Sequence, residues 1–231
     1  MVNMDVDVEA LKSWRRDAGS LPRIALDIDS TWAGIDQIIL DNFNKAKGTN
    51  FTIEDHTDWD FKNLGSSYVE MMPFYVSAWV DRWKEIPFLG DLSLTIELTK
   101  DYYVSLLTTR SPTSEGVTGG TVDTMHEWIR LHGIDKILPP AQICDPKQNK
   151  AKDFDYDAYI DDSPRLADTV MQMPGKIQFL VDQGYNREVK DDGKKIIRVQ
   201  DANHAMRLLI EVARGTIVSE EPRMTIKLKK C

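Results

Sequence analysis

Residues 23–31 read RIALDIDST, a short apolar run that ends in two aspartates one residue apart and a threonine. Such a run is typical of a central strand of a parallel sheet, which is buried on both faces. The carboxyl end of that strand lies at the sheet edge where α/β proteins bind ligands. Because two carboxylates this close repel each other, Asp27 and Asp29 predict a cation site or an acid/base site.

Composition restricts the classes of protein that this chain can belong to. It has 231 residues, 42% of them hydrophobic and 29% charged, enough for one domain or for one domain with an inserted subdomain. The net charge of -8 and the isoelectric point near 5.1 argue against a stable nucleic-acid partner, which requires clustered lysine and arginine. A small anionic substrate remains compatible with this charge.

The cysteines and the apolar segments bear on location. Cys144 and Cys231 form no evident disulfide framework. The amino terminus carries no secretory signal pattern, and no apolar run reaches the length of a membrane span. We therefore expect a cytoplasmic protein that has no membrane partner.

Apolar runs and helical periodicities alternate along the chain, which predicts βαβ units and a mostly parallel sheet. Strands are expected at 24–26, 102–107, 142–144, 157–160 and 177–181, and helices at 34–47, 92–98, 122–132, 164–171 and 202–213. The predicted fold class is α/β, a Rossmann-like three-layer parallel sheet with a helical cap inserted after the first strand. The expected division is an N-terminal extension at 1–22 that contains a short helix, a core at 23–33 and 89–215, a cap at 34–88 and a tail at 216–231.

The predicted cap is unusually aromatic. It contains Trp59, Phe61, Tyr68, Phe74, Tyr75, Trp79, Trp83 and Phe88. Five of these rings favour a place in the core of the cap over a base-stacking surface, although some aromatic residue of the cap is expected to stack on a base; the five are Trp59, Phe74, Tyr75, Trp79 and Trp83. The four histidines show no metal-ligand spacing, which indicates structural or surface roles.

Polar residues of chemical interest follow three of the predicted strands. They are Asp27, Asp29 and Thr31, then Thr108 and Thr109, then Asp161 and Asp162, with Lys147, Lys150 and Lys152 just before the last pair. Carboxylates from two strand ends make a hard oxygen site that suits Mg²⁺. Hydroxyls and a lysine beside it can bind phosphate oxygens. Taken singly, an Asp-x-Asp-x-Thr usually marks a turn and a lysine run a solvated face, so the prediction depends on the ordered set.

The order DIDST, LLTT, lysine and IDD resembles the four motifs of the haloacid dehalogenase-like superfamily. More narrowly, TIEDHTDWDF, LLTTR, YIDDSP and FLVDQGYNR resemble the 5′(3′)-deoxyribonucleotidase branch, also called 5′-nucleotidase type C. The resemblance covers most of residues 23–185. Ser30 departs from it, because these nucleotidases usually have glycine after the second aspartate.

The resemblance implies a role for each carboxylate. Asp27 is the expected nucleophile, which forms an aspartyl-phosphate, and Asp29 protonates the leaving oxygen and then activates water. The cofactor Mg²⁺ is expected on Asp27, the main-chain carbonyl of Asp29 and Asp161, with Asp162 as a further metal residue.

The same resemblance implies two phosphate-binding groups. Thr108 is expected to bind a phosphate oxygen, and Lys150 or Lys152 to neutralise the developing charge. The spacing along the chain does not choose between the two lysines.

These expectations describe a Mg²⁺-dependent phosphomonoesterase that hydrolyses (deoxy)nucleoside monophosphates. A phosphatase for another small phosphate ester or a polynucleotide end is the alternative enzyme. A non-catalytic phosphate-binding module is a further alternative, but such a module has no need of the acid/base carboxylate of Asp29. The sequence leaves a homodimer open.

Overall fold

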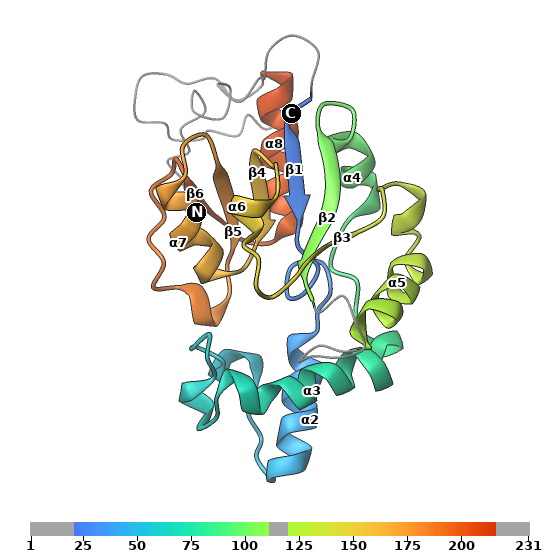
Figure 1. Ribbon diagram of the computed structural model, residues 1–231, viewed down its shortest axis with the longest axis vertical. Helices are drawn as coiled ribbons and strands as arrows, with labels where there is room; N and C mark the ends of the chain where they lie inside the picture. The colour runs from blue at the N-terminus through green and yellow to red at the C-terminus, as the bar shows by residue number, and fades with distance from the viewer. Residues whose placement is uncertain (1–20, 111–119, 216–231) are drawn as a thin grey trace, which may run out of the picture.

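The computed structural model describes residues 21–110 and 120–215, so the expected N-terminal helix and the tail at 216–231 lie outside the described residues. Six parallel strands form one sheet in the order β3-β2-β1-β4-β5-β6 (Figure 1). Their bounds are β1 Arg23–Leu26, β2 Tyr103–Thr109, β3 Gln142–Cys144, β4 Ala158–Asp161, β5 Ile177–Val181 and β6 Ile196–Val199. The predicted α/β parallel-sheet class is confirmed.

The central register brings the carboxyl ends of three strands together. Leu26 of β1 lies opposite Leu106 of β2 and Ile160 of β4. The Asp27 N–H continues the ladder by donating to the Ile160 carbonyl at 2.9 Å. The residues that follow Leu26, Leu106 and Ile160 therefore meet at one edge of the sheet.

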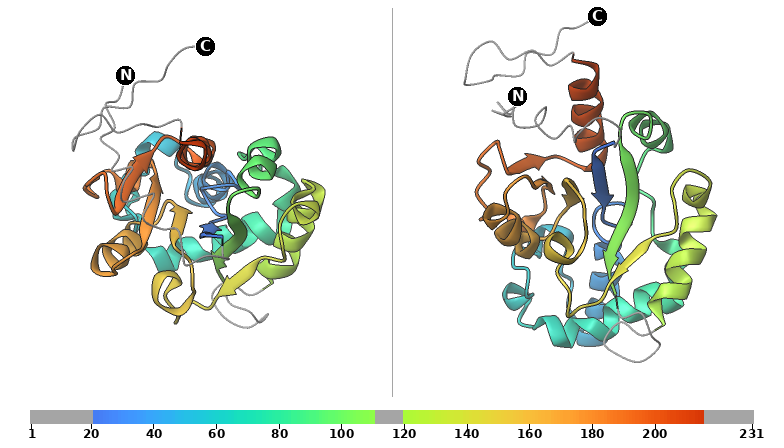
Figure 2. Two further views of the ribbon diagram at one scale, coloured as in Figure 1. Left: turned by 90° about the horizontal axis from the view of Figure 1, so that it is seen from above. Right: turned by 45° about the horizontal axis from the view of Figure 1, so that its top comes forward.

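Helices cover both faces of the sheet (Figure 2). Ile24 and Leu26 of β1 belong to the larger hydrophobic cluster, which includes side chains from α4 (Leu92–Leu98), α5 (Thr121–Leu131) and α8 (Ala202–Arg214). Ala25 points to the other face and belongs to the second cluster, with α6 (Lys150–Asp153) and α7 (Pro164–Gln172). Burial on both faces explains why Ile24, Ala25 and Leu26 of β1 are all apolar.

The chain between β1 and α4 forms helices that lie beyond the carboxyl ends of the strands (Figure 1). They are α2 (Asp36–Lys47) and α3 (Tyr68–Asp81), with the short 3₁₀ helices Ile53–Asp55, Lys62–Leu64 and Trp83–Glu85. We call residues 34–88 the cap segment, and we propose the core and cap boundaries given above as the division of the chain. The cap segment lies over the edge of the sheet where the polar residues gather.

Three of the strands and α-helices were absent from the individual sequence predictions: β6, the one-turn helix α6, and α3, which was expected only as part of a helical cap. Strand β6 is an edge strand of four residues, which pairs only with β5 in the sheet order. Two 3₁₀ helices, Ile134–Lys136 and Gly184–Asn186, complete the elements of the described chain. Within residues 21–110 and 120–215, none of the helices combines the length and the apolar character that crossing a bilayer demands.

Candidate active site

Three carboxylates form a buried cluster at the central sheet edge. Asp27 directly follows β1, Asp161 is the last residue of β4, and Asp162 comes next. Each offers one oxygen, these oxygens all lie within 4.8 Å of one another, and all three residues are buried. Three hard oxygen ligands from neighbouring backbone segments fit a divalent cation such as Mg²⁺.

Lys150 is buried and joins two members of this cluster. Its Nζ lies 2.8 Å from Asp27 Oδ1 and 2.6 Å from Asp161 Oδ2. The side chain of Asn149 accepts from the amides of Ala151 and Lys152, which caps α6 and fixes its first residue beside the sheet. Lys152 is exposed, so of the two candidate lysines the structure brings only Lys150 to the carboxylates.

Burial and mutual repulsion change the proton affinity of these groups. Burial raises the pKa of Asp27 to about 7, against the lowering effect of the Lys150 ammonium. Burial, with Asp161 and Asp27 nearby, also raises the pKa of Asp162 well above its usual range. Burial opposes the charged form of Lys150, but the Asp161 and Asp27 carboxylates outweigh it and raise its pKa. A site with this excess of negative charge favours a cation.

The Asp29 carboxylate lies in a different set of contacts. The Arg110 Nη2 donates to both of its oxygens, at 2.9 and 3.0 Å. The Tyr75 hydroxyl donates at 2.9 Å, the Trp79 Nε1 at 2.8 Å and the Thr108 hydroxyl at 3.5 Å. Donors from the carboxyl end of β2 and from α3 of the cap segment therefore fix the orientation of Asp29.

Arg110 is a residue that the sequence prediction left without a role. Its side chain is fully buried, its Nη1 donates to the Tyr75 hydroxyl at 2.5 Å, and its guanidinium lies over the Trp79 ring at 4.4 Å. Trp79 is fully buried, as expected for a core ring, and its indole N–H also serves Asp29. The sequence did offer a signal for this role, because Arg110 directly follows the buried strand at the end of LLTTR, and a buried charge requires a charged or hydrogen-bonding partner.

A second group of contacts orients Asp162. The Tyr185 hydroxyl donates to its Oδ2, and the Thr31 hydroxyl donates to its Oδ1 at 3.3 Å. The Asn186 side chain donates to its main-chain carbonyl at 2.8 Å. Tyr185 and Asn186 belong to the FLVDQGYNR segment, whose individual residues the sequence did not assign.

Ser30 has the backbone conformation that glycine adopts most easily. Its φ is +56°, in the left-handed region, and its amide donates to the Ala33 carbonyl at 2.9 Å. The chain turns here so that Asp27 and Asp29 both remain at the sheet edge. Glycine adopts this conformation most easily, and this chain has serine there.

A cavity of about 450 Å³ lies between the sheet edge and the cap segment. Among the predicted site residues, Asp27, Asp29, Thr108, Lys150 and Asp162 line it, and Asp161 is joined to it through Lys150. Its further lining includes the cap side chains Asp36, His56, Trp59, Phe61, Tyr68 and Tyr75 and the core side chain Tyr185. The cavity therefore combines a polar floor of carboxylates with walls of aromatic and aliphatic side chains.

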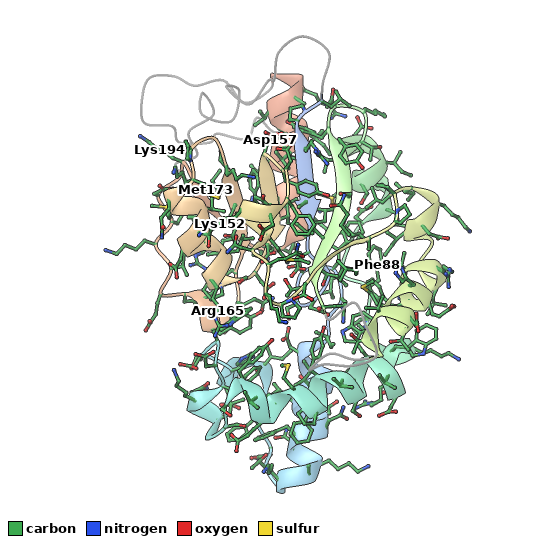
Figure 3. The ribbon with its side chains drawn as sticks, in the orientation of Figure 1. Phe88, Lys152, Asp157, Arg165, Met173 and Lys194 are labelled. Atoms are coloured by element: carbon green, nitrogen blue, oxygen red, sulfur yellow. The ribbon has the colours of Figure 1, made fainter. Side chains whose placement is uncertain are left out.

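The cap segment contacts the core on the side of α7. Arg165 Nη2 lies 2.7 Å from Asp60 Oδ1, and the Arg165 guanidinium lies over the Tyr68 ring at 5.8 Å. Figure 3 shows Arg165 on the side of α7 that faces the cap segment. The loop at 56–61 also packs on Tyr185, whose ring centroid is 4.6 Å from His56 and 5.3 Å from Trp59. These contacts close one side of the cavity.

Comparisons with known proteins define the fold. No family model matches the chain, and no curated protein matches it. The chain is similar to a haloacid dehalogenase-like hydrolase from Burkholderia xenovorans, with 12% identity and a TM-score of 0.54, over 84% of this chain and 99% of the other. A haloacid dehalogenase-like family hydrolase from Xanthomonas campestris matches at 13% identity and a TM-score of 0.50, over 85% and 100%.

A third solved structure shows why the fold does not settle the activity. Protein tyrosine kinase A from Mycobacterium tuberculosis matches at 13% identity and a TM-score of 0.52, over 83% of this chain and 99% of the other. At these identities the likeness establishes a shared fold, that of haloacid dehalogenase-like hydrolases. The activity has to be argued from the site.

Proposed function

We propose that this chain is a Mg²⁺-dependent phosphomonoesterase that hydrolyses nucleoside monophosphates, in the manner of the 5′(3′)-deoxyribonucleotidases. The observation that carries the proposal is that one cavity is lined by Asp27, Asp162, the Lys150 ammonium and the separately held Asp29. The third carboxylate of the cluster, Asp161, is bonded to Lys150. A binding module has no need of a second carboxylate beside the first, whereas phosphate transfer through a carboxylate needs both.

Asp27 is the nucleophile in this proposal. One of its oxygens attacks phosphorus, a new P–O bond forms, and the bond from phosphorus to the ester oxygen of the substrate breaks. The Lys150 Nζ, 2.8 Å from Asp27 Oδ1, favours the ionised carboxylate and offsets charge on the phosphate. When bound, Mg²⁺ would reduce the repulsion between the anionic nucleophile and the phosphate, and Asp27, Asp161 and Asp162 would hold it.

Asp29 moves the protons. In its protonated form it donates one to the leaving oxygen, and the resulting carboxylate, which pairs with Arg110, takes one from the water that attacks the aspartyl-phosphate. That attack breaks the bond between Asp27 and phosphorus, so that inorganic phosphate leaves and both side chains return to their initial forms. Arg110, Tyr75 and Trp79 act on this step by positioning Asp29.

The cavity supports a nucleotide over a sugar phosphate. Its volume of about 450 Å³ is in the range of small-ligand sites, and its walls include Phe61, Tyr68 and Tyr185. Aromatic rings stack on bases with a gain of about 1–3 kcal/mol per base, equivalent to roughly tenfold to a hundredfold in affinity.

A phosphatase screen with Mg²⁺ tests the proposal. We expect nucleoside monophosphates to be hydrolysed with a higher kcat/KM than sugar phosphates or an aryl phosphate, and EDTA to stop turnover. Asp27→Asn is expected to abolish activity, because the amide has the same shape and is not nucleophilic, while the matched control Asp155→Asn, an exposed aspartate, retains it. Nucleotide binding without hydrolysis of any ester would instead identify a binding module, and full activity in excess EDTA would exclude the metal.

A further inference from the structure

The loop that carries two of the clustered carboxylates is held by two buried amide side chains. The loop consists of Asp161, Asp162 and Ser163. The Gln178 Nε2 donates to the Asp161 carbonyl and to the Ser163 carbonyl, each at 3.1 Å. The Asn186 Nδ2 donates to the Asp162 carbonyl between them at 2.8 Å. Three consecutive main-chain carbonyls therefore accept hydrogen bonds from side chains that lie outside the loop.

Gln178 is an unusual residue for its place in the sheet. It is the second residue of β5, whose five residues are all buried, and its own side chain is fully buried. Such a strand favours apolar residues, because a buried polar group that lacks hydrogen bonds lowers stability. The Gln178 Oε1 has no partner within residues 21–110 and 120–215, so the loop carbonyls are what this amide serves. Both of its donor hydrogens are available to them.

Asn186 is fixed in turn by the edge strand β6. Its side chain is 1% exposed, and its Nδ2 also donates to the Val181 carbonyl at 2.7 Å. Arg198 of β6 donates from Nη1 to the Asn186 Oδ1 at 2.8 Å and from Nη2 to the Asn186 carbonyl at 3.0 Å. Hydrogen bonds to both ends of the amide fix its orientation. Arg198 is therefore connected to the Asp162 carbonyl through one buried side chain.

The carboxylates of this loop need such support because they repel each other. Asp161, Asp162 and Asp27 are buried with ligand oxygens within 4.8 Å of one another, and Lys150 pairs with two of the three. Repulsion between like charges is strong where solvent is scarce, and a shift of the loop would relieve it. A neutral amide resists that shift without placing a further positive charge beside the cation site. The two amides therefore hold the ligands together and leave their charge available.

We infer that Gln178 and Asn186, which we call the amide clamp, are positioning residues that keep this loop in the arrangement that a divalent cation requires. Arg198 acts through Asn186. The inference rests on the proposed function, because it takes Mg²⁺ as the cation. A cation that binds preformed ligands does not have to order the loop, which would oppose binding by the entropy that the loop loses. Loss of an outer contact of this kind typically weakens metal binding about 10–100-fold.

The test measures metal affinity without substrate. Mn²⁺ accepts the same oxygen ligands, its free form is counted from its electron paramagnetic resonance signal, and Mg²⁺ is titrated in as a competitor. Gln178→Met keeps a long unbranched side chain and removes both donors, so the Kd of both cations is expected to rise about 10–100-fold. Thr95→Val is the matched control. Thr95 is also fully buried, donates to a main-chain carbonyl at 2.8 Å and is outside the cavity lining, so its loss should leave the Kd unchanged.

Urea denaturation with and without Mg²⁺ separates positioning from general stability. A merely structural role lowers the free energy of unfolding equally in both conditions. The clamp predicts a larger loss with Mg²⁺, because a bound cation stabilises the folded chain less as its Kd rises. Arg198→Met provides the same comparison where Gln178→Met does not fold, since Arg198 lies on the edge strand with its side chain 22% exposed. Its Kd is expected to rise in the same direction.

The outcomes distinguish this inference from the proposed function. Wild-type Kd values in the clamp variants, with stability losses that are equal with and without Mg²⁺, would refute the inference and leave the phosphatase intact. Failure of the wild type to bind either cation would also refute it. Cation binding that is strong in the wild type and weakened in Gln178→Met, without hydrolysis of any phosphate ester by the wild type, would keep the inference and refute the proposed function.

Discussion

Replacement of Arg110 by methionine tests the contact between the cap segment and the acid/base carboxylate. The guanidinium is fully buried and lies 2.9 Å from Asp29, whose side chain is 21% exposed. Removal of one partner of a buried ion pair usually lowers the free energy of unfolding by about 3–5 kcal/mol, because the other charge is left uncompensated. Asp29 keeps donors from Tyr75, Trp79 and Thr108, so we expect the lower value, about 3 kcal/mol. For a chain of this size, that is a fall in Tm of roughly 6–12 °C.

The assay is urea denaturation of the wild type, Arg110→Met, Asp29→Asn and the double variant. Each single change leaves a group without its charged partner, so the double variant should lose at least about 1.5 kcal/mol less than the sum of the single losses. Arg130→Met is the control, because Arg130 forms an exposed pair with Glu127, and it should change stability by less than about 0.5 kcal/mol. A loss below about 1 kcal/mol in Arg110→Met, together with additive effects in the double variant, would refute this account.

Three further predictions concern the core loop and the cap segment. Tyr185→Phe removes the hydroxyl that donates to Asp162 and is expected to weaken Mg²⁺ activation about 10–100-fold. The control Tyr156→Phe removes a buried hydroxyl outside the cavity lining and should leave the Mg²⁺ titration unchanged. Equal Mg²⁺ titration curves for Tyr185→Phe and wild type would contradict this prediction. The pKa of His56 is lowered to about 4, so as the pH falls from 6.5 to 4 the unfolded chain binds a proton at this histidine before the folded chain does. The free energy of unfolding of the wild type should therefore fall by about 2 kcal/mol between pH 7.5 and 5 relative to that of His56→Phe. Parallel pH–stability curves for the two proteins would contradict this prediction. Gly184→Ala would place a Cβ 2.5 Å from the His56 carbonyl oxygen, so it should displace the loop at 56–61 and raise the KM for nucleotides. An unchanged KM would show that this loop does not need the close packing against Gly184.

The sequence alone was sufficient for most of the sheet and for the main carboxylates. A buried parallel strand requires a continuous apolar run, and the run that ends in Asp27 and Asp29 is a local pattern. Because all parallel strands end at the same edge, the strand ends themselves predicted that Asp27 and Asp161 would meet. Strand β6 was missed because an edge strand of four residues has too short a pattern, and its pairing with β5 forms only in the folded chain.

The tertiary structure decided which side chains meet at that edge. Lys150 and Lys152 are equivalent in spacing, and only the capped turn of α6 buries the first and exposes the second. Arg110 acquired a role because α3 folds back over the end of β2 and brings aromatic donors to Asp29. Contacts of this kind join residues far apart in the chain, as Thr31 and Asp162 are at 131 positions. No local periodicity encodes them, because they depend on how whole elements pack.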